Sequence, residues 1–256
     1  MLTSPFFYAV AIPAVILLGL AKGGFSGIGV MGVPLMTLAI SPVQAASITL
    51  PILIVQDVVS VWSFRRSWNG KVLALMLPAA ALGIYAGYAL AAYVKPAAVE
   101  LAVGMISIVF GLQRLWVERG HAAAPARALP VWLGPVFGAL SGFTSQVSHG
   151  GGPPFQIYAM PLRLQRDAFI GTSAIFFAAV NWMKVPAYAA LGQFTRQNLA
   201  TSAALFPLAI ASTFAGVVLV RKVDAERFYR IVYLLLVLVG AKLVFDGASA
   251  LVHLRG

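Results

Sequence analysis

The chain has 256 residues, of which 61% are hydrophobic and 10% are charged, and its mean hydropathy is +0.91. This composition excludes an ordinary soluble domain and predicts a polytopic membrane protein, because apolar runs of about 20 residues can span a bilayer as helices. The net charge of +11 does not require a nucleic-acid partner, since the cytoplasmic loops of membrane proteins collect Lys and Arg. The chain has no cysteine, which excludes disulfides and thiolate metal sites.

Apolar runs divide the chain into ten segments, five in each half. In the first half they cover Pro5 to Ala21, Ile28 to Ile40, Val43 to Phe64, Val72 to Val94 and Ala98 to Trp116. In the second half they cover Pro130 to Val147, Gly152 to Pro161, Arg166 to Leu191, Leu199 to Val220 and Phe228 to Leu251. We therefore predict an all-α integral membrane protein with a first transmembrane repeat over 1–117, a cytoplasmic linker over 118–129 and a second repeat over 130–256.

The second segment of each half is too short to cross a bilayer as an α-helix. At about 1.5 Å per residue, Gly152 to Pro161 reaches only about half way across a hydrocarbon core of about 30 Å. We expect the first two segments of each half to form a dipping hairpin or a discontinuous helix. Irregular backbone at this depth requires protein or water to satisfy its polar groups, so the tips of the hairpins should line a cavity.

One glycine-rich stretch follows the first segment of each half, and the two stretches align at a constant offset of 119 residues. The matched pairs are Gly19 with Gly138, Gly23 with Gly142, Ser26 with Ser145, Gly32 with Gly151, and Pro34 with Pro153. Further matches at an offset of 129 join Pro78 with Pro207, Gly87 with Gly216, and Gly111 with Gly240. A duplicated break of this kind predicts one binding site built from both halves of a transporter.

Loop charges predict that the second repeat is inverted relative to the first. In the first half, Arg65, Arg66 and Lys71 lie between segments three and four, whereas only Lys95 lies between segments four and five. In the second half, Arg196 lies between segments three and four, whereas Arg221, Lys222 and Arg227 lie between segments four and five. Placing the richer loops in the cytoplasm gives the halves opposite orientations and puts both termini outside.

Several of these motifs resemble the TauE/SafE family of sulfite exporters. They are the early Lys-Gly-Gly-Phe followed by Gly-x-Gly and Pro, the later Ser-Gly-Phe and His-Gly-Gly-Gly-Pro-Pro, and Asn181-x-x-Lys184 ahead of Gly192. The resemblance covers about Ala9 to Gly247. It implies a bacterial or archaeal inner-membrane permease that moves sulfur oxoanions or organosulfonates such as sulfite or sulfoacetate.

Backbone N–H groups at the glycine-rich breaks are the first candidates for binding an anion. Free N–H groups at helix N-termini carry partial positive charge, and glycine allows a ligand to approach them closely. The candidates are Gly23, Gly24, Gly27 and Gly29 in the first half and Gly150, Gly151 and Gly152 in the second. The alternative is that these glycines only let helices pack closely.

Buried ionisable residues are the second group of candidates. Lys22 at membrane depth marks a substrate pathway or a structural ion pair, for which Asp57 is the most plausible partner. If the segment lies at a shallower depth, Lys22 could instead extend to the membrane interface. Asp57 could also relay protons. Lys184 and Asn181 share one helix face and could both donate to one anion, or Lys184 could extend outward while Asn181 binds a neighbouring helix. His149 suits proton-coupled transport or a capping role. The remaining polar candidates for substrate binding are Ser26, Gln56, Thr144 and Ser145, with Gln146, Ser148 and Gln156 as weaker signals around the same breaks.

The leading hypothesis is a secondary anion transporter with alternating access and no cofactor. The sequence has no Walker-type phosphate loop, no metal-ligand spacing, and no nucleophile with a base, so ATP hydrolysis, a metal site and covalent catalysis are not expected. The expected partners are a small anionic substrate and the lipid bilayer, and the sequence leaves a homo-oligomer open. The alternatives are a permease for carboxylates or other inorganic anions, an intramembrane enzyme, and a membrane subunit without transport activity.

Overall fold

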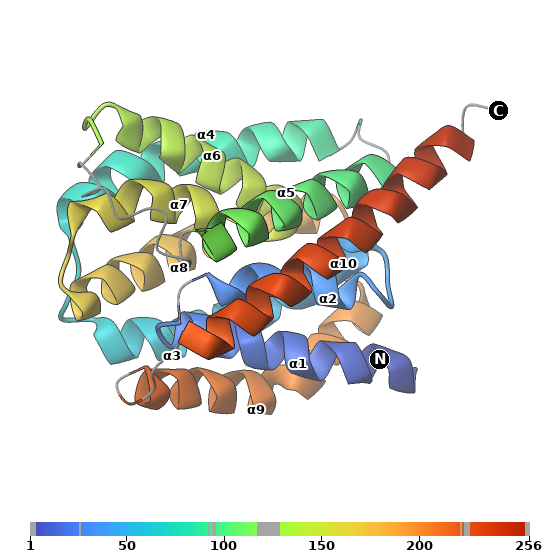
Figure 1. Ribbon diagram of the computed structural model, residues 1–256, viewed down its shortest axis with the longest axis horizontal. Helices are drawn as coiled ribbons and strands as arrows, with labels where there is room; N and C mark the ends of the chain where they lie inside the picture. The colour runs from blue at the N-terminus through green and yellow to red at the C-terminus, as the bar shows by residue number, and fades with distance from the viewer. Residues whose placement is uncertain are drawn as a thin grey trace.

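The computed structural model describes residues 4–25, 27–91, 93, 96–116, 129–220, 222 and 226–253. Over these residues every regular element is helical (Figure 1). The long helices are α1 (Pro5–Lys22), α3 (Pro42–Phe64), α4 (Gly70–Ala91), α5 (Pro96–Trp116), α6 (Leu133–Ser148), α8 (Arg166–Ala190), α9 (Arg196–Leu219) and α10 (Glu226–His253). The short ones are η1 (Ile28–Met31), α2 (Gly32–Met36), α7 (Gly152–Ala159) and η3 (Met160–Leu162).

Local sequence signals start several of the long helices. Ser4 and Ser41 cap α1 and α3 by accepting a hydrogen bond from the backbone N–H three residues later, and Thr195 caps α9 in the same way. A proline follows each of the two serines at the first helical position, where the N–H that it lacks has no partner in the helix. Prolines also lie inside α1, α3, α4, α8 and α9, which membrane helices tolerate because neighbouring groups satisfy the freed carbonyls.

The helices have the length and surface of membrane spans. Among the described residues, five helices are long and apolar enough to cross a membrane. They are α1, α3, residues 70–90 of α4, α8 and α9. Large apolar side chains lie on the outside, and those of Trp62, Leu82 and Phe245 are 67 to 71% exposed. Such side chains are stable on an outer surface when lipid rather than water covers it.

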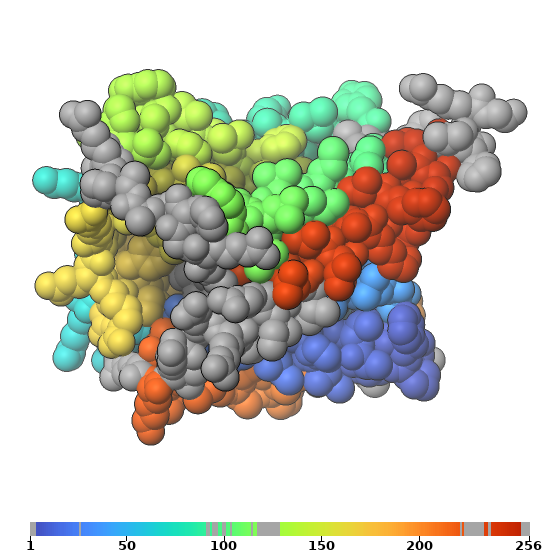
Figure 2. Space-filling model, viewed as in Figure 1, coloured from blue at the N-terminus to red at the C-terminus, as the bar shows by residue number. Residues whose placement is uncertain are grey.

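Helices from the two halves are interleaved. In Figure 1, α4 lies beside α6, α5 beside α10 and α1 beside α9, and α3 packs against both α8 and α9. One hydrophobic core joins α1, α2, α3 and α9, and a second joins α4, α7 and α8. On the face shown in Figure 2, α5 and α10 run diagonally across the front of the molecule. The short helices η1 and α7, one from each half, approach each other where Val30 lies 3.8 Å from the position of a Cβ on Gly152.

The observed helices follow the predicted segments closely. Most helix boundaries lie within about three residues of the predicted ones. The largest difference is in the second segment, where the predicted run from Ile28 to Ile40 is a short 3₁₀-helix followed by α2, which ends at Met36. The predicted linker 118–129 lies outside the described residues except for Leu129.

Candidate functional site

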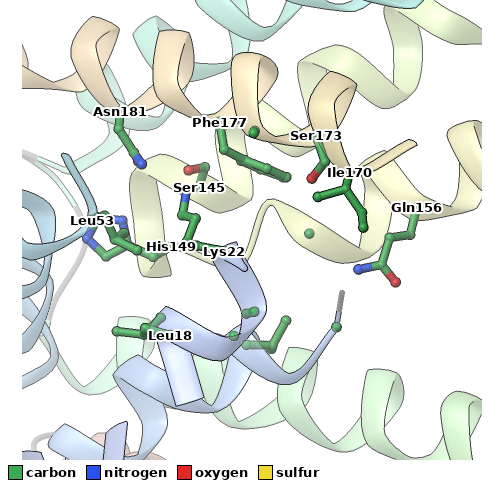
Figure 3. A pocket seen from close by; sticks show the side chains of 16 residues that line it. Leu18, Lys22, Leu53, Ser145, His149, Gln156, Ile170, Ser173, Phe177 and Asn181 are labelled. Carbon is green, nitrogen blue, oxygen red and sulfur yellow. The ribbon is translucent and has the colours of Figure 1, made fainter. Parts of the chain in front are cut away.

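A cavity of about 90 Å³ lies where the break after α1 meets α6, α7 and α8 (Figure 3). One water requires about 10–15 Å³ measured in the same way, so the cavity has room for a compact oxoanion. It is lined by Leu18, Ala21, Lys22, Gly27, Gly29, Val30, Leu53, Ser145, His149, Gly152, Gln156, Ile170, Ser173, Ala174, Phe177 and Asn181. Both glycine-rich breaks therefore contribute to one cavity.

Lys22 lies in the last turn of α1 and reaches from the cavity wall to α3. Its Nζ forms an ion pair with Asp57 Oδ1 and lies 5.4 Å from the centroid of the Phe177 ring. The other carboxylate oxygen, Asp57 Oδ2, accepts a hydrogen bond of 2.6 Å from Asn181 Nδ2. Ser60 Oγ donates to the backbone carbonyl of Lys22 over 2.7 Å, which fixes the end of α1 against α3. Side chains from α1 and α8 thus hold the Asp57 carboxylate of α3 in place.

His149 ends α6 with its backbone in the left-handed region, at φ +54°, a conformation that a non-glycine residue rarely adopts. This turn places the ring between α3 and α8. Its Nε2 lies 2.9 Å from the carbonyl oxygen of Ala46, and its Nδ1 lies 2.6 Å from Lys184 Nζ. Because a carbonyl can only accept, Nε2 carries the ring proton and Nδ1 accepts from the ammonium. His149 is therefore neutral in this arrangement.

Lys184 on α8 is fully buried, with 0% of its surface exposed. Besides His149, its Nζ donates to the hydroxyl and the backbone carbonyl of Ser145, over 3.1 and 3.3 Å. All three acceptors are neutral, and no carboxylate among the described side chains forms an ion pair with this lysine. A buried ammonium without a countercharge is costly. The site therefore contains a buried amine without an acidic partner, and a bound anion would favour its charged form.

A comparison with known families fits this geometry. Residues 11–243 match the family described as sulfite exporter TauE/SafE. The chain belongs to the TauE/SafE family. The match includes both glycine-rich breaks and all the lining residues, so this TauE/SafE chain is a multi-pass membrane protein of a transporter family. Neither a curated protein nor a solved structure matches it.

The structure brings some of the predicted site residues of the TauE/SafE chain together. Lys22, Gly27, Gly29, Ser145, His149, Gly152 and Asn181 line the cavity. Asp57 and Lys184 lie directly behind these side chains and are bonded to them. The other predicted residues that the structure describes are not among those lining it, namely Gly23, Gly24, Gln56, Thr144, Gly150 and Gly151. Ser26 lies outside the described residues.

Two predicted polar residues have other places in the structure. Gln56 is 0% exposed, and its Nε2 donates to the carbonyl of Val15 over 3.2 Å, so it joins α3 to α1. Thr144 lines a second cavity of about 400 Å³ between α3, α4, α5, α6 and α8. Its hydroxyl donates to the carbonyl of Leu140 over 2.7 Å within α6.

The glycines at the breaks also have a packing role. The N–H groups of Gly23, Gly24 and Gly150 donate to carbonyls of the preceding helices at 2.8, 3.2 and 3.1 Å. A Cβ on Gly23 would lie 2.5 Å from the Gly216 backbone, and one on Gly151 would lie 2.7 Å from the carbonyl oxygen of Ser141. Gly24 has φ +133°, which disfavours any other residue. Close packing and backbone geometry are thus sufficient reasons for glycine at these positions.

The lining residues that were not predicted to bind substrate include Ser173, Phe177 and Gln156. Ser173 and Phe177 precede Asn181 by eight and four residues on α8, so all three lie on the same helix face. Extending the helical period backward from Asn181 would have found them. Gln156 was noticed only as a weak polar signal, because a glutamine on a short apolar helix has no special pattern.

Proposed function

We propose that this protein is a secondary transporter that carries a small anion across the membrane by alternating access. The observation that carries this proposal is the charge of the residues around the cavity. In their protonated forms Lys22 and Lys184 carry two positive charges against the one negative charge of Asp57, and His149 is neutral by its hydrogen bonds. Among the side chains that the structure describes, Asp57 is the buried carboxylate, so one positive charge remains. A monoanion in the cavity would balance it.

We infer that the two halves are inverted repeats. The packing supports this, because α1 packs on α9 as α6 packs on α4, while α3 pairs with α8 and α5 pairs with α10. These are the pairs expected if α1 to α5 correspond to α6 to α10 through a pseudo-twofold axis. The reversed loop charges support the same arrangement, with both termini outside the inner membrane. The cavity between the two halves would then open to each side in turn.

The substrate class that fits best is a sulfur oxoanion or an organosulfonate. Family membership favours it, and the cavity offers what a compact oxoanion needs in exchange for its hydration shell. Lys22 supplies an ammonium group, and Ser145, Ser173 and Asn181 supply hydroxyl and amide groups. These groups bind any small oxoanion, so carboxylates and other inorganic anions must be compared directly.

Transport by the purified chain in proteoliposomes tests the proposal. We expect uptake of labelled sulfite down its gradient, inhibition by small sulfonates, and weaker inhibition by acetate and sulfate. Lys184→Met should abolish uptake, whereas Lys242→Met, which breaks the exposed ion pair to Asp246 on α10, should leave it unchanged. If folded wild-type protein transports none of these anions, the transport proposal is wrong.

A further inference from the structure

Lys184 is a buried amine whose hydrogen bonds can be completed with or without a positive charge. Its Nζ lies 3.1 Å from the hydroxyl and 3.3 Å from the backbone carbonyl of Ser145, and 2.6 Å from His149 Nδ1. As an ammonium it donates to all three. As a neutral amine it donates to the carbonyl and to Nδ1, and its lone pair accepts from the Ser145 hydroxyl, which can either donate or accept. The same three contacts therefore serve both forms.

The surroundings of Lys184 favour the neutral amine while the cavity is empty. The side chain is 0% exposed, and a buried charge without a countercharge is costly. The titratable groups that face it are His149 on α6, Lys22 on α1, Asp57 on α3, and Tyr188 one turn later on α8. His149 is neutral, and Lys22 and Asp57 are paired with each other. Tyr188 is a neutral phenol whose hydroxyl donates to a backbone carbonyl. None of these groups supplies a countercharge to the amine.

An anion in the cavity would change this balance through Ser145. The hydroxyl bonds to no acceptor among the described residues, and Ser145 lies on the cavity wall in Figure 3. When Nζ is charged, the hydroxyl proton is free to turn toward the cavity and donate to the anion. The acceptor atom of the anion then lies within about 6 Å of Nζ, because an O–H···O bond adds about 2.7 Å. At an effective dielectric constant of about 20, a unit charge at this distance favours the ammonium by about a hundredfold.

Resting on the proposed anion transport, we propose that Lys184 takes up a proton when the anion binds and releases it when the anion leaves, so that anion and proton cross the membrane together. The Ser145 hydroxyl passes its own proton to the Nζ lone pair and receives another from a hydronium ion in the cavity, which becomes water. In the empty site, the charges of Lys22 and Asp57 cancel. In the loaded site, the ammonium also cancels the charge of a monoanion. Neither form then places a net charge at membrane depth, where charge is costly.

Proton uptake by the purified full-length chain tests this coupling directly. Methanesulfonate and chlorate are anions of strong acids and carry no proton at the working pH, so any proton taken up joins the protein. Calorimetry near neutral pH, in buffers of different ionisation enthalpy, counts these protons from the slope of the binding enthalpy against the buffer enthalpy. We expect about one proton per bound anion, and an affinity that falls by about tenfold per pH unit as the pH is raised through neutral.

Substitutions identify the group that takes up the proton. Lys184→Met removes the amine, and Lys184→Arg replaces it with a guanidinium that stays charged, so the count should fall to about zero in both. His149→Asn keeps an acceptor for the amine, and asparagine tolerates the left-handed backbone at this position. This variant should keep a count of about one even where its affinity falls. Lys242→Met, at the exposed ion pair on α10, is the matched control and should keep both the count and the affinity. The wild-type count stands on its own if neither Lys184 variant folds.

Transport in proteoliposomes gives a second readout of the same coupling. Because an anion and a proton together carry no net charge, a pH gradient that is acidic outside should drive accumulation of labelled methanesulfonate. A potassium diffusion potential without a pH gradient should not.

The outcomes separate this inference from the transport proposal. Binding without proton uptake, or an unchanged count in Lys184→Met, would overturn the inference and leave anion transport in place. Accumulation driven by the potential alone, or a count lost in His149→Asn, would overturn it as well. Binding of sulfite but of neither strong-acid anion would show that the proton arrives on the anion instead of on Lys184. If the folded wild-type protein binds none of these anions, the anion function fails and the inference fails with it.

Discussion

Removing Lys22 should destabilise the protein more than removing its partner Asp57. In Lys22→Met, the Asp57 carboxylate is 2% exposed and keeps only the hydrogen bond from Asn181 as a direct polar contact among the described residues. Breaking a buried ion pair from one side costs about 3–5 kcal/mol, and the remaining bond from Asn181 favours the lower end. For a chain of this size, about 3 kcal/mol corresponds to a fall in melting temperature of about 6–12 °C.

In Asp57→Asn, the remaining charge is better tolerated. The Lys22 side chain is 13% exposed and lines the cavity, so its ammonium can reach water there. The double variant Lys22→Met, Asp57→Asn contains no unpaired charge and should recover at least half of the loss seen in Lys22→Met. Thermal unfolding in detergent, followed by tryptophan fluorescence, measures all three variants.

The exposed pair Lys242–Asp246 provides the control for this experiment. Its side chains are 57 and 36% exposed, so Lys242→Met should change the melting temperature little. The reasoning would be refuted if the double variant were less stable than Lys22→Met, because the two charges would then act independently. It would also be refuted if Lys22→Met and Lys242→Met had the same melting temperature.

Three further predictions follow from the packing, the loop charges and the buried charge. Gly216→Val should prevent α1 from packing on α9, because a Cβ there lies 2.9 Å from the backbone of Leu20. The melting temperature should fall far more than in Gly192→Ala, where the new Cβ meets open space and the cost is limited to the strain of a left-handed φ of +66°, about 1–2 kcal/mol. Single cysteines at the exposed positions Arg66 and Gln197 should react with a membrane-impermeant maleimide from opposite sides of the membrane, and labelling of both from one side would contradict the topology. Lys184→Met should weaken sulfite binding by about tenfold or more. A unit charge within about 8 Å of the anion contributes about 2 kcal/mol at an effective dielectric constant of about 20. Unchanged affinity in calorimetry would show that this charge does not act on the ligand.

Much of the helical architecture could be predicted from the sequence, because length and hydropathy are strong signals in a bilayer. The short segment beginning at Gly152 was predicted from length alone, and α7 ends at Ala159. The contact between Lys22 and Asp57 was foreseen as one of three alternatives, beside ligand binding and extension to the interface, since few carboxylates lie in apolar segments. A charge buried at membrane depth is so costly that it needs a partner, and few residues in apolar segments can serve as that partner.

Details that depend on how helices approach one another could not be predicted. The sequence assigned Gly24 and Gly151 to anion binding, whereas the structure also gives each a local reason, a positive φ in Gly24 and close packing on Ser141 in Gly151. The bond between His149 and Lys184 depends on a left-handed backbone at the end of α6, which no sequence pattern indicates. Tertiary packing decides such contacts.

The most direct test of the central claim is to locate a bound anion. Hydrogen selenite has the shape and charge of hydrogen sulfite, and selenium can be located by its anomalous scattering in crystals of the wild-type protein. We predict one dominant selenium site in the cavity lined by Lys22, Ser145, His149, Gln156 and Asn181. A dominant site in the second cavity or on the outer surface, with no selenium beside Lys22, would contradict the account.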